Sequence, residues 1–141
     1  MQDMVTRALL AGLRASAGES STIRSRVLRT WGLAESALAE KLGPRFDALA
    51  ASDSPVTIAF LASGIEGIKV RLTAKAATET DALAALADEE AAVRCVLGDI
   101  VFGVDAETME ASVGKLLVAR GETLGLAESL TGGLVGSRCA A

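Results

Sequence analysis

Two apolar runs with a period of two, joined by a short turn, constrain the fold of this chain more than any other feature. The runs are "VTIAFLAS" and "IKVRLTAKA", and the residues between them read "GIEG". In the second run, apolar side chains occupy every second position from Ile68 to Leu72, with polar side chains between them. This period belongs to strands with one buried face, so the segment predicts an antiparallel hairpin.

The segments that flank this hairpin have the patterns of a strand and two helices. The stretch "STIRSRVLRTWG" is rich in β-branched residues and predicts a strand that closes at Gly32. A helix follows it, for which Pro44 supplies a stop. After the hairpin, a long helix starts near Thr80, and Glu90 and Arg94 form an exposed pair one turn apart on it. Residues 20–98 therefore predict a β-α-β-β-α domain of the α+β class, in two layers.

The predicted core of this domain takes one apolar face from each element. Its members are Val27, Leu38, Ile58, Val70, Leu83, Leu86 and Val93.

A second unit is expected from residue 99 onward. Asp105 can cap a helix whose apolar residues lie on one face, and Gly121 can end it. The apolar residues 124–127 then predict a short strand, which leads through a small-residue loop into another helix. That order opens an α/β sheet, but residues 99–141 fall below the roughly 50 residues of a small domain. We expect the truncated start of an α/β domain here, and residues 1–17 read as the terminal helix of a missing amino-terminal domain.

Composition excludes several classes of chemistry. The chain has no histidine and no tyrosine, so Ser-His-Asp and Cys-His catalysis and His-ligated metal sites are ruled out. Its two cysteines lack CxxC spacing, which predicts no metal or cofactor and a reducing, cytoplasmic location. The net charge of −4 is spread along the chain and predicts no nucleic-acid partner. The apolar runs are shorter than the roughly 20 residues of a membrane span, so no membrane partner is expected.

Two short motifs have plain structural interpretations. The "GIEG" sequence matches the GxxG loop of RNA-binding KH domains, but that loop joins two helices and clamps phosphates. Here the motif joins two strands and contains Glu66, so we interpret it as a hairpin turn. The sequence "AES" occurs first inside a helical pattern, where Ser36 is a solvated or capping residue.

The second "AES" is followed by two glycines and is the candidate site. The predicted strand brings Ser129 to a sheet edge, and Thr131, Gly132 and Gly133 begin a helix whose free N–H groups favour a phosphate or an oxyanion. A capped helix packed closely against a strand would show the same pattern. A serine nucleophile needs a base, and no lysine is placed convincingly near Ser129. Glu128 is assigned to substrate binding or to orientation of the loop.

The stretch "LLVARGETLGLAESLTGGLVGSR" resembles the opening of the nicotinamide-nucleotide amidase domain of the CinA competence/damage-inducible family. The preceding "VFGVDAETMEASVGKLL" resembles the entry into that domain, and "RVLRTWGLAESALAEKL" with "GIKVRLTA" resembles the KH-like middle domain of the family. Residues 1–17 resemble the last helix of its molybdopterin-binding-like domain. The resemblance thus covers nearly the whole chain and implies a KH-like domain over residues 18–98 and an amidase start over residues 99–141.

The resemblance implies deamidation of nicotinamide mononucleotide by a serine nucleophile with lysine and tyrosine partners. Ser129 matches the nucleophile, while Thr131, Gly132 and Gly133 match the loop expected to bind substrate and provide amides. The lysine and tyrosine belong to a later segment of the family, so we expect the chain itself to be inactive. Leu130 stands where many members carry cysteine, and Cys139 where leucine is usual. The alternative is a non-catalytic linker or interaction module, and a homo-oligomer through missing domains is possible on either interpretation.

Overall fold

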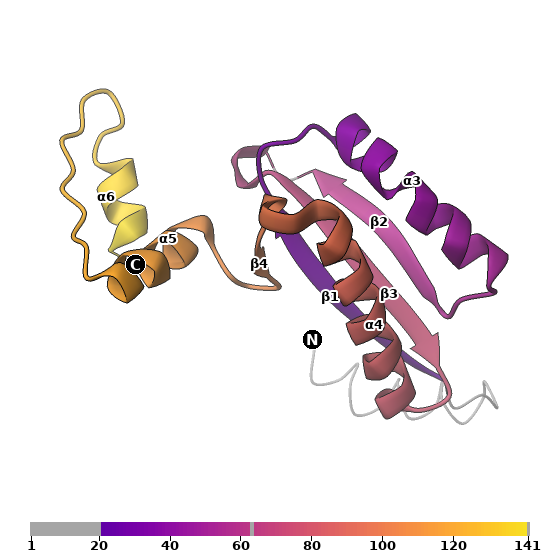
Figure 1. The fold of residues 1–141 in the computed structure, drawn as a ribbon. Helices are drawn as coiled ribbons and strands as arrows, with labels where there is room; N and C mark the ends of the chain where they lie inside the picture. Colours follow the sequence, from indigo (N-terminus) through magenta and orange to yellow (C-terminus); the bar gives the residue numbers. More distant parts are fainter. Residues whose placement is uncertain (1–20, 63, 141) are drawn as a thin grey trace, which may run out of the picture.

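The computed structural model describes residues 21–62 and 64–140 of the 141-residue chain. The helix expected over residues 1–17 lies outside the described residues. In chain order the elements are β1 (Thr22–Thr30), α3 (Glu35–Ala51), β2 (Val56–Ala62), the 3-10 helix η2 (Gly64–Glu66), β3 (Ile68–Ala76), α4 (Glu79–Leu97), the 3-10 helix η3 (Gly98–Ile100), β4 (Val101–Val104), α5 (Met109–Arg120) and α6 (Leu134–Cys139) (Figure 1).

The first six large elements form a two-layer α+β domain, as the sequence predicts. The four strands make one antiparallel sheet in the order β2-β3-β1-β4, and helices α3 and α4 cover one face of it (Figure 1). Strands β1 and β2 run parallel with β3 between them, and β3 and β4 run parallel with β1 between them. These two interlocked split βαβ units give the β-α-β-β-α-β order of a ferredoxin-like arrangement. The hairpin predicted over β2 and β3 is confirmed.

Strand β4 extends this sheet past residue 98, where the sequence suggested that the second unit begins. Leu28 of β1 pairs with Val104, and Thr30 pairs with Val101 across a register shift. The N–H of Trp31 also donates to the carbonyl of Ile100 at 3.1 Å. A four-residue strand carries too short a pattern to show its partner, because that partner lies far away along the chain. The pairing with β1 is therefore visible only in the folded molecule.

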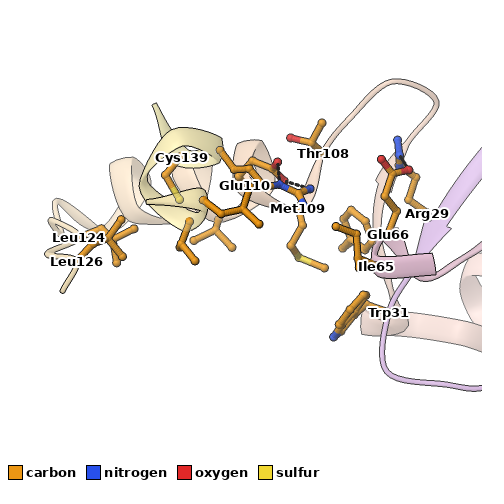
Figure 2. A pocket seen from close by; sticks show the side chains of 15 residues that line it. Arg29, Trp31, Ile65, Glu66, Thr108, Met109, Glu110, Leu124, Leu126 and Cys139 are labelled. Atoms are coloured by element: carbon orange, nitrogen blue, oxygen red, sulfur yellow. Dashed lines mark hydrogen bonds and ion pairs between the residues drawn. The ribbon is translucent and has the colours of Figure 1, made fainter. Parts of the chain in front are cut away.

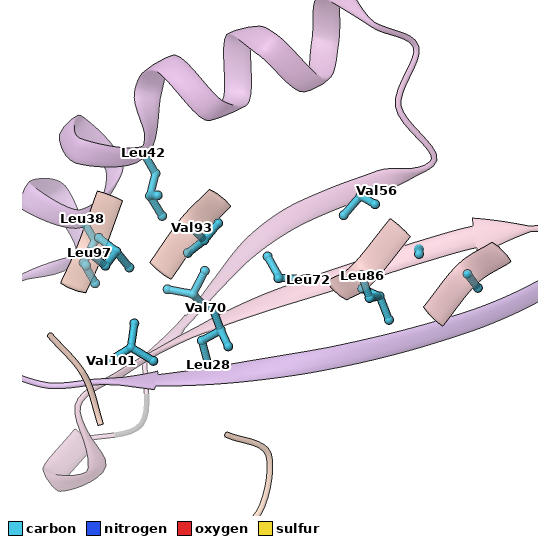
Figure 3. Close-up of a cluster of buried hydrophobic side chains, with 12 residues drawn as sticks. Leu28, Leu38, Leu42, Val56, Val70, Leu72, Leu86, Val93, Leu97 and Val101 are labelled. Carbon is cyan, nitrogen blue, oxygen red and sulfur yellow. The ribbon is translucent and has the colours of Figure 1, made fainter. Parts of the chain in front are cut away.

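The hydrophobic core lies between the sheet and the two helices (Figure 3). Its buried members are Leu28, Leu38, Leu42, Val56, Val70, Leu72, Ala74, Ala82, Leu86, Val93, Leu97 and Val101.

Most of the predicted core positions are correct, and two are wrong. Ile58 is partly buried and packs against the cluster. On β1 the core residue is Leu28 rather than Val27, and on α4 Leu83 is 45% exposed. On β1, the face toward α4 also carries Arg24 and Arg26, which pair with glutamates of that helix. Because polar residues lie on the covered face of β1, the sequence does not show which of two adjacent positions faces the helices. Side chains at adjacent strand positions point to opposite faces, so an error of one position exchanges Val27 for Leu28.

Three predicted helix boundaries differ in the structure. Helix α4 is capped by Thr78 rather than Thr80. The Thr78 hydroxyl accepts a hydrogen bond from the N–H of Asp81 at 3.1 Å. Helix α5 is capped by Thr108, whereas the carboxylate of Asp105 accepts from the N–H of Val27 on β1. Pro44 lies inside α3 instead of ending it. Its ring removes one helical hydrogen bond, but on the exposed side of the helix water can satisfy the released carbonyl.

The predicted pair of Glu90 and Arg94 is confirmed, with 2.9 Å between Oε1 and Nε. Within the described part of the chain, no helix combines the length and apolar character that crossing a bilayer requires.

Candidate functional site

The residues after β4 form a small unit without a buried core. Helix α5 ends at Gly121, whose φ of 65° is left-handed, as expected for this stop. The chain then passes through an extended stretch and a tight loop into the short helix α6, which lies beside α5 and apart from the sheet (Figure 1). No residue between 105 and 140 is buried. This unit positions all the predicted site residues on the surface.

The strand predicted over residues 124–127 is not formed. Residues 122–128 adopt no regular secondary structure, and within residues 21–62 and 64–140 no strand pairs with them. A strand is defined by hydrogen bonds to a neighbour, and the alternating pattern in the sequence carries no information on whether one is present. Ser129 accordingly follows an extended segment, and α6 begins at Leu134 rather than directly after the serine.

Ser129 opens a loop with an unusual concentration of left-handed backbone. The φ angles are 75° at Leu130, 63° at Gly132 and 86° at Gly133. The glycines adopt this conformation at little cost, whereas a leucine is strained there. The Ser129 side chain is exposed, and among the described residues no hydrogen bond engages its hydroxyl or the N–H groups of Gly132 and Gly133. These groups are free to meet a ligand.

The neighbouring Glu128 is bound to the chain itself. Its carboxylate accepts from the hydroxyl of Thr131 at 2.6 Å, from the N–H of Val135 at 2.9 Å and from the N–H of Gly136 at 2.7 Å. The Thr131 hydroxyl and these backbone donors hold the pKa of Glu128 below its usual value of 4.5. The carboxylate thereby occupies the start of α6, where the sequence suggested that a phosphate could bind. Among the described residues, the N–H groups of residues 129–133, which include those of Gly132 and Gly133, have no hydrogen-bond acceptor.

An ion pair joins the two helices of this unit. Arg138 of α6 donates from Nε to Glu110 Oε1 at 2.6 Å and from Nη2 to Oε2 at 3.2 Å (Figure 2). The guanidinium lowers the pKa of Glu110, and the two parallel bonds fix the orientation of α6 across α5.

No base accompanies Ser129 in the described residues. Lys115, which the sequence places on the preceding helix, pairs with Glu107 at the start of α5 and lowers the pKa of that carboxyl. The remaining lysines lie on α3 and β3 of the α+β domain. In the same residues no cluster of three or more His, Cys, Asp or Glu side chains could hold a metal ion.

A cavity of about 550 Å³ lies between the end of β1, η2 and the helices α5 and α6 (Figure 2). Its walls are mostly apolar and include Trp31, Ile65, Phe102, Met109, Val113 and Leu134. Ser129 is not among its lining residues. The sequence contains no sign of this cavity, because its lining residues come from six separate stretches of the chain. The exposed Trp31 and Ile65 carry no pattern by which to find it.

The "GIEG" motif forms η2 and joins β2 to β3, as the sequence predicts. Glu66 pairs with Arg29 Nη2 at 2.8 Å and with Lys69 Nζ at 2.7 Å. The hydrogen bonds from Lys69 and Arg29 lower the pKa of Glu66 to about 2. The basic groups next to the motif are therefore already neutralised by a carboxylate of the motif itself.

Comparison with known proteins covers nearly the whole chain. Residues 25–103 match the family model described as the damage-inducible protein CinA KH domain. A "CinA-like protein" of Frankia casuarinae is 43% identical over 138 residues, which are 98% of this chain and 31% of that protein. A "CinA-like protein" of Synechococcus elongatus is 38% identical over 136 residues, with 96% and 31% covered. A "Putative competence-damage inducible protein" of Clostridium kluyveri is 41% identical over 116 residues, with 82% and 27% covered.

The chain thus spans about a third of the length of the curated relatives it matches. The family model ends at residue 103, next to the end of β4, so the matched domain and the four-stranded sheet end together. The matches to the first two relatives extend over nearly the whole chain and so beyond the sheet. On this domain match, and on identities of 38–43% over nearly all its length, the chain belongs to the CinA family.

Proposed function

We propose that this chain carries the nucleophile of an amidase that removes the carboxamide nitrogen of nicotinamide mononucleotide. The observation that carries the proposal is the loop at Ser129. There an exposed serine hydroxyl without a partner in the described residues stands beside two glycines whose N–H groups are also unused. Membership of the CinA family and the "AESLTGG" sequence support this assignment. The KH-like domain holds this unit through β4, and we propose that the amidase domain, whose start the sequence suggested over residues 99–141, begins after that strand.

The chemistry follows from the groups in the loop. The Ser129 Oγ attacks the carboxamide carbon, and its proton passes to a base that we place outside the described residues. The carbonyl oxygen becomes an oxyanion, to which the N–H groups of Gly132 and Gly133 donate hydrogen bonds. Collapse of the tetrahedral intermediate breaks the C–N bond, and the base gives the serine proton to the nitrogen, which leaves as ammonia. Water then attacks the acyl-serine, which frees the carboxylic acid and restores the hydroxyl.

For the whole protein we propose nicotinamide mononucleotide as substrate, no nucleic-acid or membrane partner, and a cytoplasmic location. A homo-oligomer through domains beyond this segment is compatible with this proposal. Residues 21–62 and 64–140 hold no base near Ser129, so we expect the 141-residue chain by itself to release no ammonia. A longer protein that carries this segment together with the lysine and tyrosine that the resemblance implies would be active.

The test is an ammonia-release assay on nicotinamide mononucleotide with four proteins. These are the 141-residue chain, a full-length protein with this segment, and its Ser129→Ala and Ser137→Ala variants. Ser137 lies on α6 with an exposed side chain, so it controls for loss of a serine hydroxyl in the same unit. We expect activity only in the full-length protein and its Ser137→Ala variant. Full activity of the Ser129→Ala variant would refute the assignment of Ser129 as the nucleophile. Activity of the 141-residue chain would refute the expectation that the base lies outside it.

One observation favours a second function. The KH-like domain has a complete core, whereas residues 105–140 have none. A chain of this kind could serve as a linker or interaction module that holds flanking domains. A full-length protein that assembles normally but releases no ammonia from any pyridine nucleotide would favour this alternative.

A further inference from the structure

The hydrogen bonds of Glu128 close a ring around the candidate nucleophile. Ser129 and Leu130 lie between Glu128 and Thr131, whose hydroxyl donates to the Glu128 carboxylate at 2.6 Å. The same carboxylate reaches across the loop to the N–H groups of Val135 and Gly136 in the first turn of α6. One side chain thus joins the start of the loop, its middle and the helix after it.

This ring holds a residue that would otherwise relax. Leu130 adopts a φ of 75°, a conformation that costs a leucine free energy and persists only where the surroundings impose it. Its side chain is fully exposed, so packing of that side chain does not impose it. The hydrogen bonds on either side of Leu130 are the interactions that can, and the bonds to the charged Glu128 are the strongest kind available.

The first turn of α6 fits around the carboxylate. A Cβ atom on Gly136 would lie 2.9 Å from Glu128 Oε1, so a larger residue at this position would displace the end of the Glu128 side chain. The far end of α6 is held by the two bonds between Arg138 and Glu110 on α5. The loop is therefore fixed at its beginning by Glu128 and after its end by an anchored helix.

We propose that Glu128 is a positioning residue, which holds the Ser129 loop in its strained form and does not bind substrate. This inference rests on the proposed function of Ser129. The carboxylate accepts three hydrogen bonds from donors of its own chain, and one of these donors is the Thr131 hydroxyl. The sequence left Glu128 open between substrate binding and orientation of the loop, and the resemblance matched Thr131 to the loop expected to bind substrate. The geometry assigns both side chains to the shape of the loop.

The positioning itself can be tested on the 141-residue chain, without any activity. We expect Glu128→Gln to accelerate amide hydrogen exchange at Val135 and Gly136 about tenfold in an NMR measurement, because glutamine is neutral and supplies only one acceptor oxygen. Glu128→Asp should change these rates less, since it keeps the charge. Glu122→Gln is the matched control, because its exposed carboxylate has no side-chain partner among the described residues. Unchanged exchange in Glu128→Gln would overturn the proposal.

The consequence for the reaction is tested on the full-length protein. We expect Glu128→Gln to lower kcat about ten- to a hundredfold with little change in KM for nicotinamide mononucleotide, because the hydroxyl is displaced while substrate contacts remain. Glu128→Asp should restore part of the rate. A raised KM with unchanged kcat would identify Glu128 as a substrate contact and overturn the proposal.

Ser129→Ala separates the two possible failures. If that variant is inactive and Glu128→Gln is fully active, the serine is the nucleophile and positioning by Glu128 is wrong. If Ser129→Ala is fully active, the proposed function fails, and with it the positioning of a nucleophile.

Discussion

At the scale of single residues, the largest departure from the apolar pattern of the helices is a buried charge. Glu89 lies on the core side of α4, between the buried Leu86 and Val93, and is 4% exposed. Arg45 of α3 donates to both of its carboxylate oxygens, and these bonds raise the pKa of the guanidinium. A buried carboxylate is tolerated only with such partners. The pair therefore links the two helices at a place where periodicity alone would predict an apolar side chain.

The residues Leu83 and Leu86 provide a matched test of the core. Leu86 is 3% exposed, whereas Leu83 on the same helix is 45% exposed. We expect Leu86→Ala to lower the free energy of unfolding by about 2–5 kcal/mol, because it removes buried methyl groups and leaves a cavity. Leu83→Ala should cost less than about 1 kcal/mol. Urea unfolding followed by circular dichroism measures both, and equal losses would contradict the burial described for α4.

The Glu66 carboxyl predicts a dependence of stability on pH. Its pKa is about 2 in the folded chain and 4.5 in an ordinary environment, so folding is favoured by the charged form. This contribution is complete above pH 4.5 and is lost as the pH falls through 2. We expect Glu66→Gln to lower the urea midpoint at pH 6 and to unfold with the wild type near pH 2. A constant difference between wild type and variant across this range would contradict the ion pairs with Arg29 and Lys69.

At the scale of elements, the connection between β2 and β3 is tighter than its sequence suggests. The chain passes through η2 and enters β3 at Gly67, whose φ is 78°. A Cβ atom there would lie 2.3 Å from the carbonyl oxygen of Thr30 at the end of β1. The glycine thus allows the hairpin to approach the neighbouring strand. Both its positive φ angle and the lack of space for a Cβ atom explain why glycine stands at this position.

Alanine at the two turn glycines separates these two causes. Gly64 also has a positive φ, 55°, but no atom of the described residues lies within 4 Å of a Cβ atom placed on it, its chain neighbours aside. We expect Gly64→Ala to cost about 1–2 kcal/mol for the left-handed backbone alone. Gly67→Ala should cost at least about 1 kcal/mol more, because the clash with the Thr30 carbonyl forces β1 and β3 to shift. Equal losses in chemical denaturation would show that the close approach is absent.

The whole molecule combines a folded domain with a unit that lacks a core of its own. Among the described residues only the folded domain carries buried side chains, and the second unit contacts it mainly where α5 packs near β4. The hydroxyl of Ser112 on α5 donates to the carbonyl of Phe102 at 3.1 Å, which helps to join them. The exposed apolar side chains of the second unit include Leu116, Val118, Leu124 and Leu134.

The charge of the whole molecule leads to a prediction on RNA. The chain carries a net charge of −4, and its GxxG sequence forms a turn whose acidic residue neutralises the two nearest basic groups. We expect no binding of single-stranded RNA oligonucleotides in fluorescence anisotropy at moderate salt, because phosphates find no free cationic clamp at this turn. A nanomolar complex that weakens steeply with added salt would contradict this expectation.

The sequence by itself determined the order and type of the elements up to α4. Alternation over residues 68–72 identified the hairpin, helical spacing identified α3 and α4, and small residues marked the turn at residues 64–67. These features are local, because a period of 2 or 3.6 reports which face of one element is buried. The family likewise followed from a contiguous motif, and the glycines after Ser129 could be recognised as part of a small-residue loop that leads into a helix without any contact being known.

The tertiary structure alone decided which residues meet across the chain. In the folded chain β4 pairs with β1, and Leu28 rather than Val27 lies in the core. Glu89 is buried against Arg45, and the Glu128 carboxylate accepts hydrogen bonds from its own loop and helix. The tertiary structure also left residues 124–127 without a strand partner in the described part of the chain. Each of these outcomes depends on a neighbour distant in sequence, or on a side chain that finds a donor within a loop. Periodicity cannot encode such partners, because it describes one face of one element and contains nothing about what lies opposite.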